Sequence, residues 1–360
     1  MLPLRFVGSA ERLGPAPVVF VDGSPLGGPP RPDGDLHLSH WPGNRTPEQL
    51  RRDLSTEIAF AFLELDESAR AELIGACEAL VLNHYDTDGV CAAFVLTSPE
   101  RARRHAALLH EIAAAGDLFE APGDRALAAD AALRNLGAAF DPGAVDGDAR
   151  KQLLLEKALE VLGDLLEDES AHEELWRADA ERHRAGAEQL ADAGFDDLVY
   201  MDFGVWTARP GSAGDARFDP GRHAFFGDGR LDRALLLGPG ADGVTARFVL
   251  GTRSFFDMAS RAGSPRPDLE ALRGALEALE PEGAAEGCAW RCHDPRGASP
   301  ELWFGRDGLP LYAEHAADHL APSRIDALEI KRLVIDAIRA TWPLLDDDDE
   351  AEEGEDIFAV

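Results

Sequence analysis

The chain has 360 residues and a formal net charge of −32, and 45% of its residues are hydrophobic while 28% are charged. This composition is typical of a folded globular protein, and the length favours two domains over a single core. So acidic a chain repels long nucleic acid, whose affinity for proteins comes largely from cations, although genome composition or a salty cytoplasm would also explain the charge.

Neither end of the sequence nor its interior predicts contact with a membrane. No run approaches the roughly 18 to 20 apolar residues of a membrane span, and residues 1–5 do not resemble a signal peptide. We therefore expect a cytoplasmic protein. Its four cysteines are too few and too scattered for a disulfide framework, so we expect free thiols.

The first predicted strands end at polar residues. Residues 18–22 are an apolar, β-branched run that ends at Asp22, and residues 35–40 alternate and end at His40. A proline and an acid after Thr46 predict a helix there, with apolar spacing as far as Phe62. A second helix is expected at about residues 68–76.

The next segment repeats the alternation of strand and helix. Residues 79–82 predict a buried strand, and a helix is expected from Val90, after Gly89. This alternation predicts an α/β fold with a mainly parallel sheet covered by helices. Ligands of such sheets bind beyond the carboxyl ends of the strands, so Asp22, His40 and residues 84–88 are the candidates.

The second half predicts a helical connector and a second, smaller α/β domain. Strands are expected at residues 198–205, 233–237 and 245–250, and helices at residues 148–193, 267–279 and 323–342. An acidic run follows, which composition predicts to be a disordered tail. The predicted domains are residues 1–145 (metal-binding), 146–195 (connector), 196–342 (substrate-binding) and 343–360 (tail).

Residues 83–89 carry the densest set of metal ligands. On an extended chain His84, Asp86 and Asp88 project to one side, Gly89 permits a sharp turn, and the following helix points its positive end at a bound anion. A calcium loop of the EF-hand type fails, because it needs an acid at position 84 and a glutamate at position 95. An ordinary solvated turn remains the alternative.

The motif His84-x-Asp86-x-Asp88-Gly89, after an apolar strand, resembles the first motif of the DHH phosphoesterase superfamily. That superfamily includes RecJ-type exonucleases, oligonucleotide and cyclic-dinucleotide phosphodiesterases and inorganic pyrophosphatases. Residues 19–22 are similar to its strand that ends in a bridging aspartate, residues 111–117 to the motif that delivers its last aspartate, and residues 39–44 to its Asp-His-His signature. The whole chain also resembles an uncharacterised bacterial family.

The resemblance implies a dinuclear site. His84 and Asp86 would hold one ion and His40 and Asp88 the other, with Asp22 and Asp117 bridging them or completing their shells. Carboxylates with imidazole suit Mn²⁺ or Mg²⁺, and two such ions activate water and bind a phosphoryl oxygen. Residues 246–254 and 267–272 resemble the family's substrate-binding domain, which assigns substrate binding to Arg253, Arg247 and Arg261.

Two features depart from the family pattern. The Asp22 and His40 elements precede the His84 motif, which requires a circularly permuted sheet. Ser39 replaces the signature's aspartate and Trp41 replaces its second histidine, which usually meets the substrate phosphate. A catalytically inert metal- or nucleotide-binding protein of the same fold is therefore the alternative to an enzyme.

Each candidate residue also has a plain structural interpretation. His40 would be satisfied by backbone at a strand end, Asp22 and Asp117 would be turn or cap residues, and Arg253 would form a surface ion pair. The predicted function is a metal-dependent phosphoesterase that acts on a small phosphodiester or short oligonucleotide, with a homodimer left open. A third hypothesis is an interaction protein whose acidic tail recruits basic partners.

Overall fold

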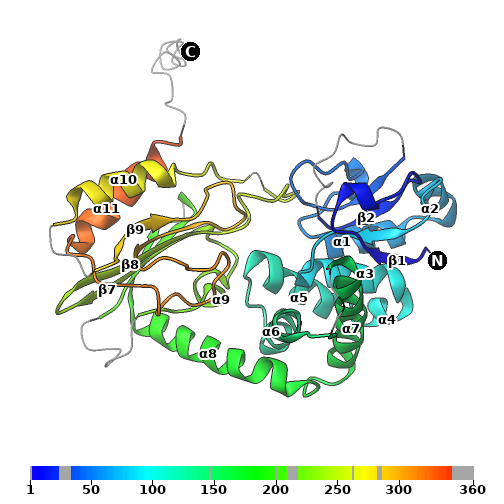
Figure 1. Cartoon of the computed structure of the whole chain (residues 1–360), viewed down its shortest axis with the longest axis horizontal. Coiled ribbons are helices and arrows are strands. Elements are labelled where there is room, and N and C mark those ends of the chain that lie inside the picture. Colours follow the sequence, from blue (N-terminus) through cyan, green and yellow to red (C-terminus); the bar gives the residue numbers. More distant parts are fainter. Residues whose placement is uncertain are drawn as a thin grey trace, which may run out of the picture.

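The computed structural model describes residues 2–23, 34–143, 145, 147–198, 201–209, 218–261, 263–281 and 286–342. Figure 1 shows two lobes, each with its own β-sheet, joined along one side by long helices. The predicted acidic tail lies outside the described residues. The mixed α/β architecture that the sequence predicts is confirmed.

The first lobe contains a four-stranded parallel sheet with the strand order β1-β4-β2-β3. The strands are β1 (Leu4–Phe6), β2 (Val19–Val21), β3 (Leu36–Leu38) and β4 (Leu80–Leu82). Strand β4 lies beside β2, and Val19 is in register with both Leu36 and Leu80. Because all four strands run the same way, the residues that follow β2, β3 and β4 meet at one edge of the sheet.

The helices of the first lobe pack against this sheet or against one another. They are α1 (Ser55–Glu64), α2 (Glu67–Ile74), α3 (Thr87–Thr97), α4 (Pro99–Arg104), α5 (Ala106–Leu118) and α6 (Asp124–Ala139), with short 3-10 turns at Ala10–Arg12 and Glu48–Leu50. Helix α3 is central: residues 87–96 are all buried, because α1, α5 and α7 (Gly147–Glu167) pack around it. Its almost continuous apolar sequence follows from that position.

The helix expected from Thr46 begins instead at Ser55. The Thr46 hydroxyl donates to the backbone oxygen of Ser39 and accepts from its amide, so it ties down the loop after β3. Helix α1 is capped from elsewhere, since the Asp88 carboxylate accepts the Ser55 and Thr56 amides. A tertiary contact therefore replaces the local N-cap that the sequence predicts.

Helix α3 begins three residues earlier than expected. Asp86 is its N-cap: its backbone is extended and its carboxylate accepts the Gly89 amide at 2.8 Å. Asp88 therefore lies in the first helical turn and not on an extended chain, which corrects the predicted arrangement of residues 84–88. The helical turn directs Asp88 toward α1.

Two helices connect the lobes. The predicted continuous helix is two elements, α7 and α8 (Glu173–Asp192), separated by a turn in which His172 has a φ of 53°. Helix α7 packs on the first lobe, and α8 packs on α6 of the first lobe and on α9 (Arg222–Phe226) of the second (Figure 1). No helix in the described ranges is long and apolar enough to cross a membrane.

The second lobe contains a six-stranded mixed sheet with the order β5-β6-β7-β8-β10-β9. Its strands are β5 (Gly194–Leu198), β6 (Phe203–Thr207), β7 (Arg233–Gly240), β8 (Gly243–Leu250), β9 (Ala289–Cys292) and β10 (Glu301–Gly305). Within residues 198–205, predicted as one strand, Leu198 ends β5 and Phe203 begins β6, and these two strands pair antiparallel.

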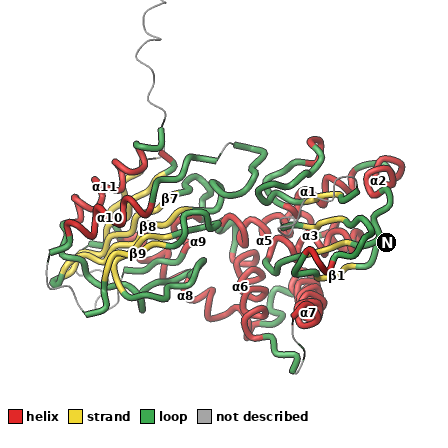
Figure 2. Tube along the Cα trace, turned by 45° about the horizontal axis from the view of Figure 1, so that its top comes forward, coloured by secondary structure: helices red, strands yellow, loops and turns green. Residues whose placement is uncertain are grey.

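Helices cover both faces of this second sheet, as Figure 2 shows. They are α9 (Arg222–Phe226), α10 (Leu269–Leu279) and α11 (Ala327–Arg339), together with α8. The predicted start of α10 is confirmed, because the Asp268 carboxylate accepts the Ala271 amide at 3.0 Å. All four cysteines are free thiols, as expected.

Candidate metal centre

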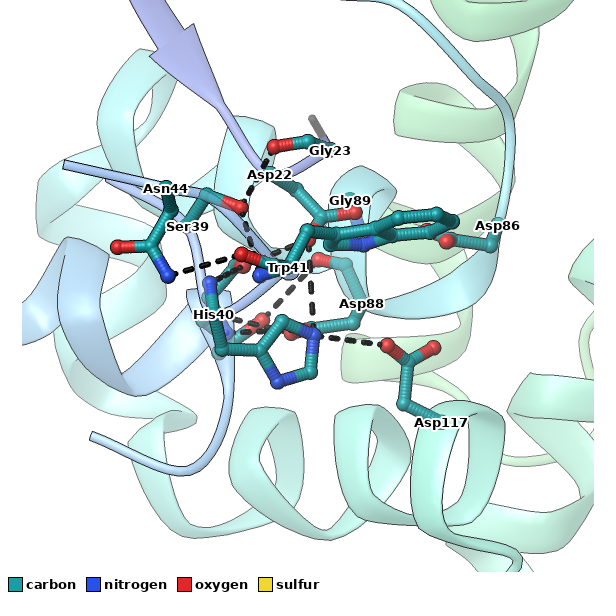
Figure 3. A network of polar contacts seen from close by, with 12 residues as sticks. Asp22, Gly23, Ser39, His40, Trp41, Asn44, Asp86, Asp88, Gly89 and Asp117 are labelled. Carbon is teal, nitrogen blue, oxygen red and sulfur yellow. Dashed lines mark hydrogen bonds and ion pairs between the residues drawn. The ribbon is translucent and has the colours of Figure 1, made fainter. Parts of the chain in front are cut away.

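Asp22 follows β2 at the carboxyl edge of the first sheet and is fully buried (Figure 3). Its φ of 61° lies in the left-handed region, which a short aspartate tolerates. Oδ1 accepts the Ser55 hydroxyl at 2.6 Å, whereas Oδ2 lies 2.8 Å from His84 Nε2 without the alignment of a hydrogen bond. Burial raises the pKa of Asp22, but the His84 and His40 imidazoles outweigh it and lower the pKa to about 2.

His40 follows β3, and the chain fixes its tautomer. Its Nδ1 lies 2.5 Å from the Asp53 carbonyl, so Nδ1 donates and Nε2 faces the acids. Nε2 is 3.1 Å from Asp117 Oδ2, 3.6 Å from Asp88 Oδ2 and 3.7 Å from Asp22 Oδ1. A histidine that donates one ring nitrogen to a carbonyl and presents the other to acids has the usual arrangement of a metal ligand.

The surroundings of His40 are strongly electronegative. Burial lowers the pKa of His40, but the Asp117, Asp88 and Asp22 carboxylates outweigh burial and raise the pKa to about 9. The Phe256 ring, which comes from the second lobe, stacks on the imidazole with 4.0 Å between ring centroids. Without metal ions, the imidazole is therefore a buried cation beside several carboxylates.

Asp88 reaches the same point from the first turn of α3. The amide of Ser55 donates to Oδ2 at 2.7 Å and that of Thr56 donates to Oδ1 at 2.9 Å. Burial and the neighbouring Asp22 carboxylate raise the pKa of Asp88 to about 7. The side chain is thus held rigidly, with Oδ2 facing His40.

His84 and Asp86 complete the other side of the site. His84 Nε2 contacts both Asp22 Oδ2 and Asp86 Oδ2, while its Nδ1 lies 3.0 Å from the Asn83 amide oxygen. Burial lowers the pKa of His84, but Asp86 and Asp22 raise it well above its usual value. Both side chains are about a quarter exposed and open into a cavity.

These contacts define two groups of possible ligands that share one residue. Asp22, His40 and Asp88 offer atoms within 4.8 Å of one another, and so do Asp22, His84 and Asp86. Asp117 contacts His40 but belongs to neither group. The structure thus brings together all six residues that the resemblance selects, with Asp22 between the two pairs.

The residues present fit divalent cations. Buried Asp22 Oδ2 forms no well-aligned hydrogen bond with a described residue and faces His84 Nε2 at 2.8 Å, so it is an acceptor that a cation would satisfy. A Cβ at Gly89 would lie 2.9 Å from Asp86 Oδ1 and 3.1 Å from Asp22 Oδ2, so only glycine leaves these oxygens free. Carboxylate oxygens with imidazole nitrogens are a donor set that suits Mn²⁺ and Mg²⁺.

A cavity of about 380 Å³ adjoins the His84 and Asp86 side. Its wall is formed by both lobes: Thr252, Phe256 and Tyr312 face Asp86 and Asp117 across it. Such a volume is at the lower end of the range for small-molecule sites. The cavity is large enough for a small substrate and too small for a folded nucleic acid.

Trp41 takes the place of the second signature histidine. Its ring lies 4.5 Å from that of His84, packs edge-on against Phe255 and Phe256, and lines the cavity. The neighbouring signature residues have structural roles, since the Ser39 hydroxyl donates to the Gly23 carbonyl and the Asn44 amide donates to the Trp41 carbonyl and Asp257. Trp41 thus presents an apolar surface at the position where the DHH superfamily pattern has an imidazole.

The three arginines predicted to bind substrate do not line this cavity. Arg247 is fully buried inside the second lobe, where it pairs with the Glu301 and Asp219 carboxylates and neutralises their charge. Arg253 pairs with Glu120, and Arg261 lies 4.0 Å from Asp202. Their predicted role therefore has no support from position.

The basic residues that do line the cavity, Arg134, Lys151 and His223, were not singled out from the sequence. Arg134 and Lys151 lie on ordinary amphipathic helices and His223 in a short helix, so no motif marks them. The scarcity of lysine in the sequence was the one available signal, because it makes each lysine unusual.

Comparison with known proteins identifies a family but no activity. Residues 2–349 match the sequence model of DUF6687, a family of unknown function. No curated protein matches the chain. Among solved structures, the chain matches a pGpG-specific phosphodiesterase, PggH, from Vibrio cholerae, with 11% sequence identity and a TM-score of 0.32 over 72% of this chain and 76% of that one. A TM-score of this size assigns neither a fold nor an activity.

Proposed function

The chain belongs to DUF6687, a family of unknown function, and from its own site we propose that it is a metal-dependent phosphoesterase. Its substrate would be a small phosphodiester or a short oligonucleotide. The observation that carries the proposal is the pair of ligand groups that share Asp22 beside a small cavity. Two-metal hydrolases of phosphate esters use such paired, carboxylate-bridged sites.

Each ligand group would hold one Mn²⁺ or Mg²⁺ ion. His84 and Asp86 would bind the first, His40 and Asp88 the second, and Asp22 would be shared between them. When bound, such ions stabilise negative charge on a phosphoryl oxygen and lower the pKa of a bound water. Asp117, whose Oδ2 lies 3.1 Å from His40 Nε2, would complete the shell of the second ion.

The remaining groups orient the ligands and exclude water. The Asp53 carbonyl holds the His40 ring in the tautomer that leaves Nε2 for the site, and the Ser55 hydroxyl fixes Asp22. Phe256 stacks on His40, which is fully buried, and Trp41 packs beside His84, which stays open to the cavity. Ligands held in this way need little reorganisation during a reaction.

Hydrolysis of bis(4-nitrophenyl) phosphate by wild type and Asp22→Asn, with and without Mn²⁺, tests the proposal. The amide oxygen of asparagine can still accept the Ser55 hydroxyl, so the substitution changes chiefly Oδ2, the oxygen that faces His84 Nε2. We expect a Mn²⁺-dependent rate in wild type and a loss of roughly 100-fold or more in the variant. Asp294→Asn is the control, because Asp294 is an exposed residue that pairs with Arg296.

Equal Mn²⁺-dependent rates in wild type and Asp22→Asn would reject the proposal.

A second function has one observation in its favour, which is the apolar Trp41 ring at the position where the DHH superfamily pattern has a histidine. That function is a catalytically inert protein that binds a metal or a nucleotide. It predicts Mn²⁺ binding that Asp22→Asn removes, together with no hydrolysis by either protein.

A further inference from the structure

Lys151 is a cation without a carboxylate partner in a very acidic protein. Acidic residues outnumber lysines and arginines by 67 to 35, and the chain has only three lysines. Lys157 Nζ lies 3.0 Å from Glu160 and Lys331 Nζ lies 2.6 Å from Asp196. The Lys151 ammonium forms no ion pair with any residue that the structure describes; it lies 5.9 Å from the centre of the Tyr85 ring and lines the cavity.

The support for Lys151 is rigid. The Tyr85 hydroxyl donates to the Leu133 carbonyl at 2.9 Å, which fixes the ring on α6. A Cβ at Gly137 would lie 2.7 Å from Tyr85 Cε1, so a glycine is required for this close packing. The aromatic ring stabilises a cation near its face and leaves the ammonium protons for another acceptor.

Arg134 supplies a second positive group to the same cavity. Its Nε donates to Asp130 Oδ2 at 2.8 Å, and Asp130 in turn accepts the Thr87 hydroxyl at 2.7 Å. This pairing uses Nε, so the terminal nitrogens of the guanidinium are not committed to Asp130. Arginine held by one edge is preorganised to bind phosphate with the other.

The cavity is therefore polarised. Asp86 and Asp117 line it from the candidate metal centre, and Arg134 and Lys151 line it from α6 and α7. The acids would be neutralised by bound cations. Arg134 pairs with Asp130 through Nε alone, and Glu314, which also lines the cavity, contacts His223. The charge of Lys151 is therefore the one that no described carboxylate balances. An anionic group of the ligand would complete this arrangement.

We propose that Lys151 and Arg134 form an anion-binding subsite that holds a phosphate group of the ligand. They are positioning residues, because they would orient a ligand whose other end meets the metal centre. If the protein hydrolyses a phosphodiester, this phosphate is a different one from the phosphate that is attacked, and that part of the inference rests on the proposed function. The binding of an anion by Lys151 does not depend on the proposed function.

Binding of inorganic phosphate to the full-length protein, measured by isothermal titration calorimetry with Mn²⁺ and again in EDTA, tests the subsite. We expect Lys151→Gln to weaken phosphate binding about tenfold, since a charged hydrogen bond of this kind is lost. Lys151→Arg should restore most of the affinity, which a merely structural role of the side chain would not predict. Lys157→Gln, on the same helix, is the matched control and should bind like wild type.

Phosphate that binds Lys151→Gln as tightly as wild type, or that does not bind wild type at all, would overturn the subsite. If phosphate binds only in the presence of Mn²⁺ and Lys151→Gln does not change its affinity, phosphate binds only to the metal ions. This result would also overturn the subsite. A protein that binds phosphate through Lys151 but hydrolyses no ester keeps the subsite and loses the proposed function. A protein that hydrolyses an ester but binds phosphate without Lys151 keeps the proposed function and loses the subsite.

Discussion

The Asp88 carboxylate both caps helix α1 and faces the candidate metal centre. Its oxygens cap α1 by accepting the Ser55 and Thr56 amides, and Oδ2 also faces His40 Nε2 at 3.6 Å. Burial and Asp22 raise the pKa of this carboxyl to about 7, while the surrounding carboxylates raise the pKa of His40 to about 9 despite burial. Near neutral pH, the metal-free site therefore carries protons that a bound cation must displace.

The affinity for Mn²⁺ should accordingly increase with pH. Both groups bind a cation only after they lose their protons, so raising the pH from about 6 to about 8 should strengthen binding by at least roughly tenfold. Titration calorimetry of the metal-free protein at several pH values measures this directly. The Asp88→Asn variant should show a shallower dependence, and an equal affinity at both ends of the range in wild type would contradict the assignment.

Helix α3 is positioned by contacts that require glycine on its neighbours. A Cβ at Gly116, on α5, would lie 2.5 Å from the Cβ of Thr87, which immediately precedes Asp88 in the sequence. The Thr87 hydroxyl is itself bound to Asp130 on α6. The close approach of α5 to α3 therefore sets where the first turn of α3, and with it Asp88, is placed.

Gly116→Ala should disturb this packing. The added methyl overlaps Thr87, so we expect a loss of about 1 to 3 kcal/mol in the free energy of unfolding and weaker Mn²⁺ binding. Gly274→Ala is the matched control, because Gly274 is an exposed position of α10 and no neighbouring atom lies within 4 Å of the added Cβ. That variant should gain up to about 1 kcal/mol. Denaturant unfolding of both proteins measures the difference, and equal stability of the two variants would argue against the overlap.

The two lobes are joined around a buried histidine. His223, from α9, donates from Nε2 to the Ala115 carbonyl on α5 at 2.9 Å, and its Nδ1 lies 3.2 Å from Glu314 Oε1. Asp130 Oδ2 is 3.6 Å from Nε2. Burial lowers the pKa of His223, but Glu314 and Asp130 outweigh it and raise the pKa. His223 therefore links the second lobe to the helix that carries Asp117, and its surroundings favour the protonated form of the imidazole.

The contact should make stability depend on pH. Because the folded-state pKa of His223 is raised, its contribution is fully present below the ordinary value of about 6.5 and is lost as the pH rises through the folded-state pKa. Glutamine can still donate to the Ala115 carbonyl but does not titrate. We therefore expect wild type to exceed His223→Gln in thermal midpoint at about pH 6, with a difference that shrinks as the pH rises through the folded-state pKa. The partly exposed His319→Gln variant is the control, and a difference independent of pH would contradict the ion pair.

Local sequence determined much of the architecture. Apolar runs ending at Asp22 and His40, and the run before His84, predicted three strands of the parallel sheet, because β-branched and apolar residues favour buried strands whatever surrounds them. Asp268 predicted the start of α10 through its own hydrogen bond to the Ala271 amide. The candidate ligands were recognised for the same reason, since their residue types and spacing lie within short segments.

Other features depended on residues far apart in the chain. Helix α1 begins at Ser55 because Asp88 caps it from 32 and 33 positions away, and that contact has no signal near Thr46. The short strand β1 and the two strands β9 and β10 form through pairing with partners elsewhere in the chain. The sequence by itself determined which residue types are available for a metal site. Only the tertiary structure decided that Asp22 lies between the two ligand pairs, and that Arg134 and Lys151 rather than Arg247 line the cavity. Long-range packing brings these side chains together, and no local pattern encodes it.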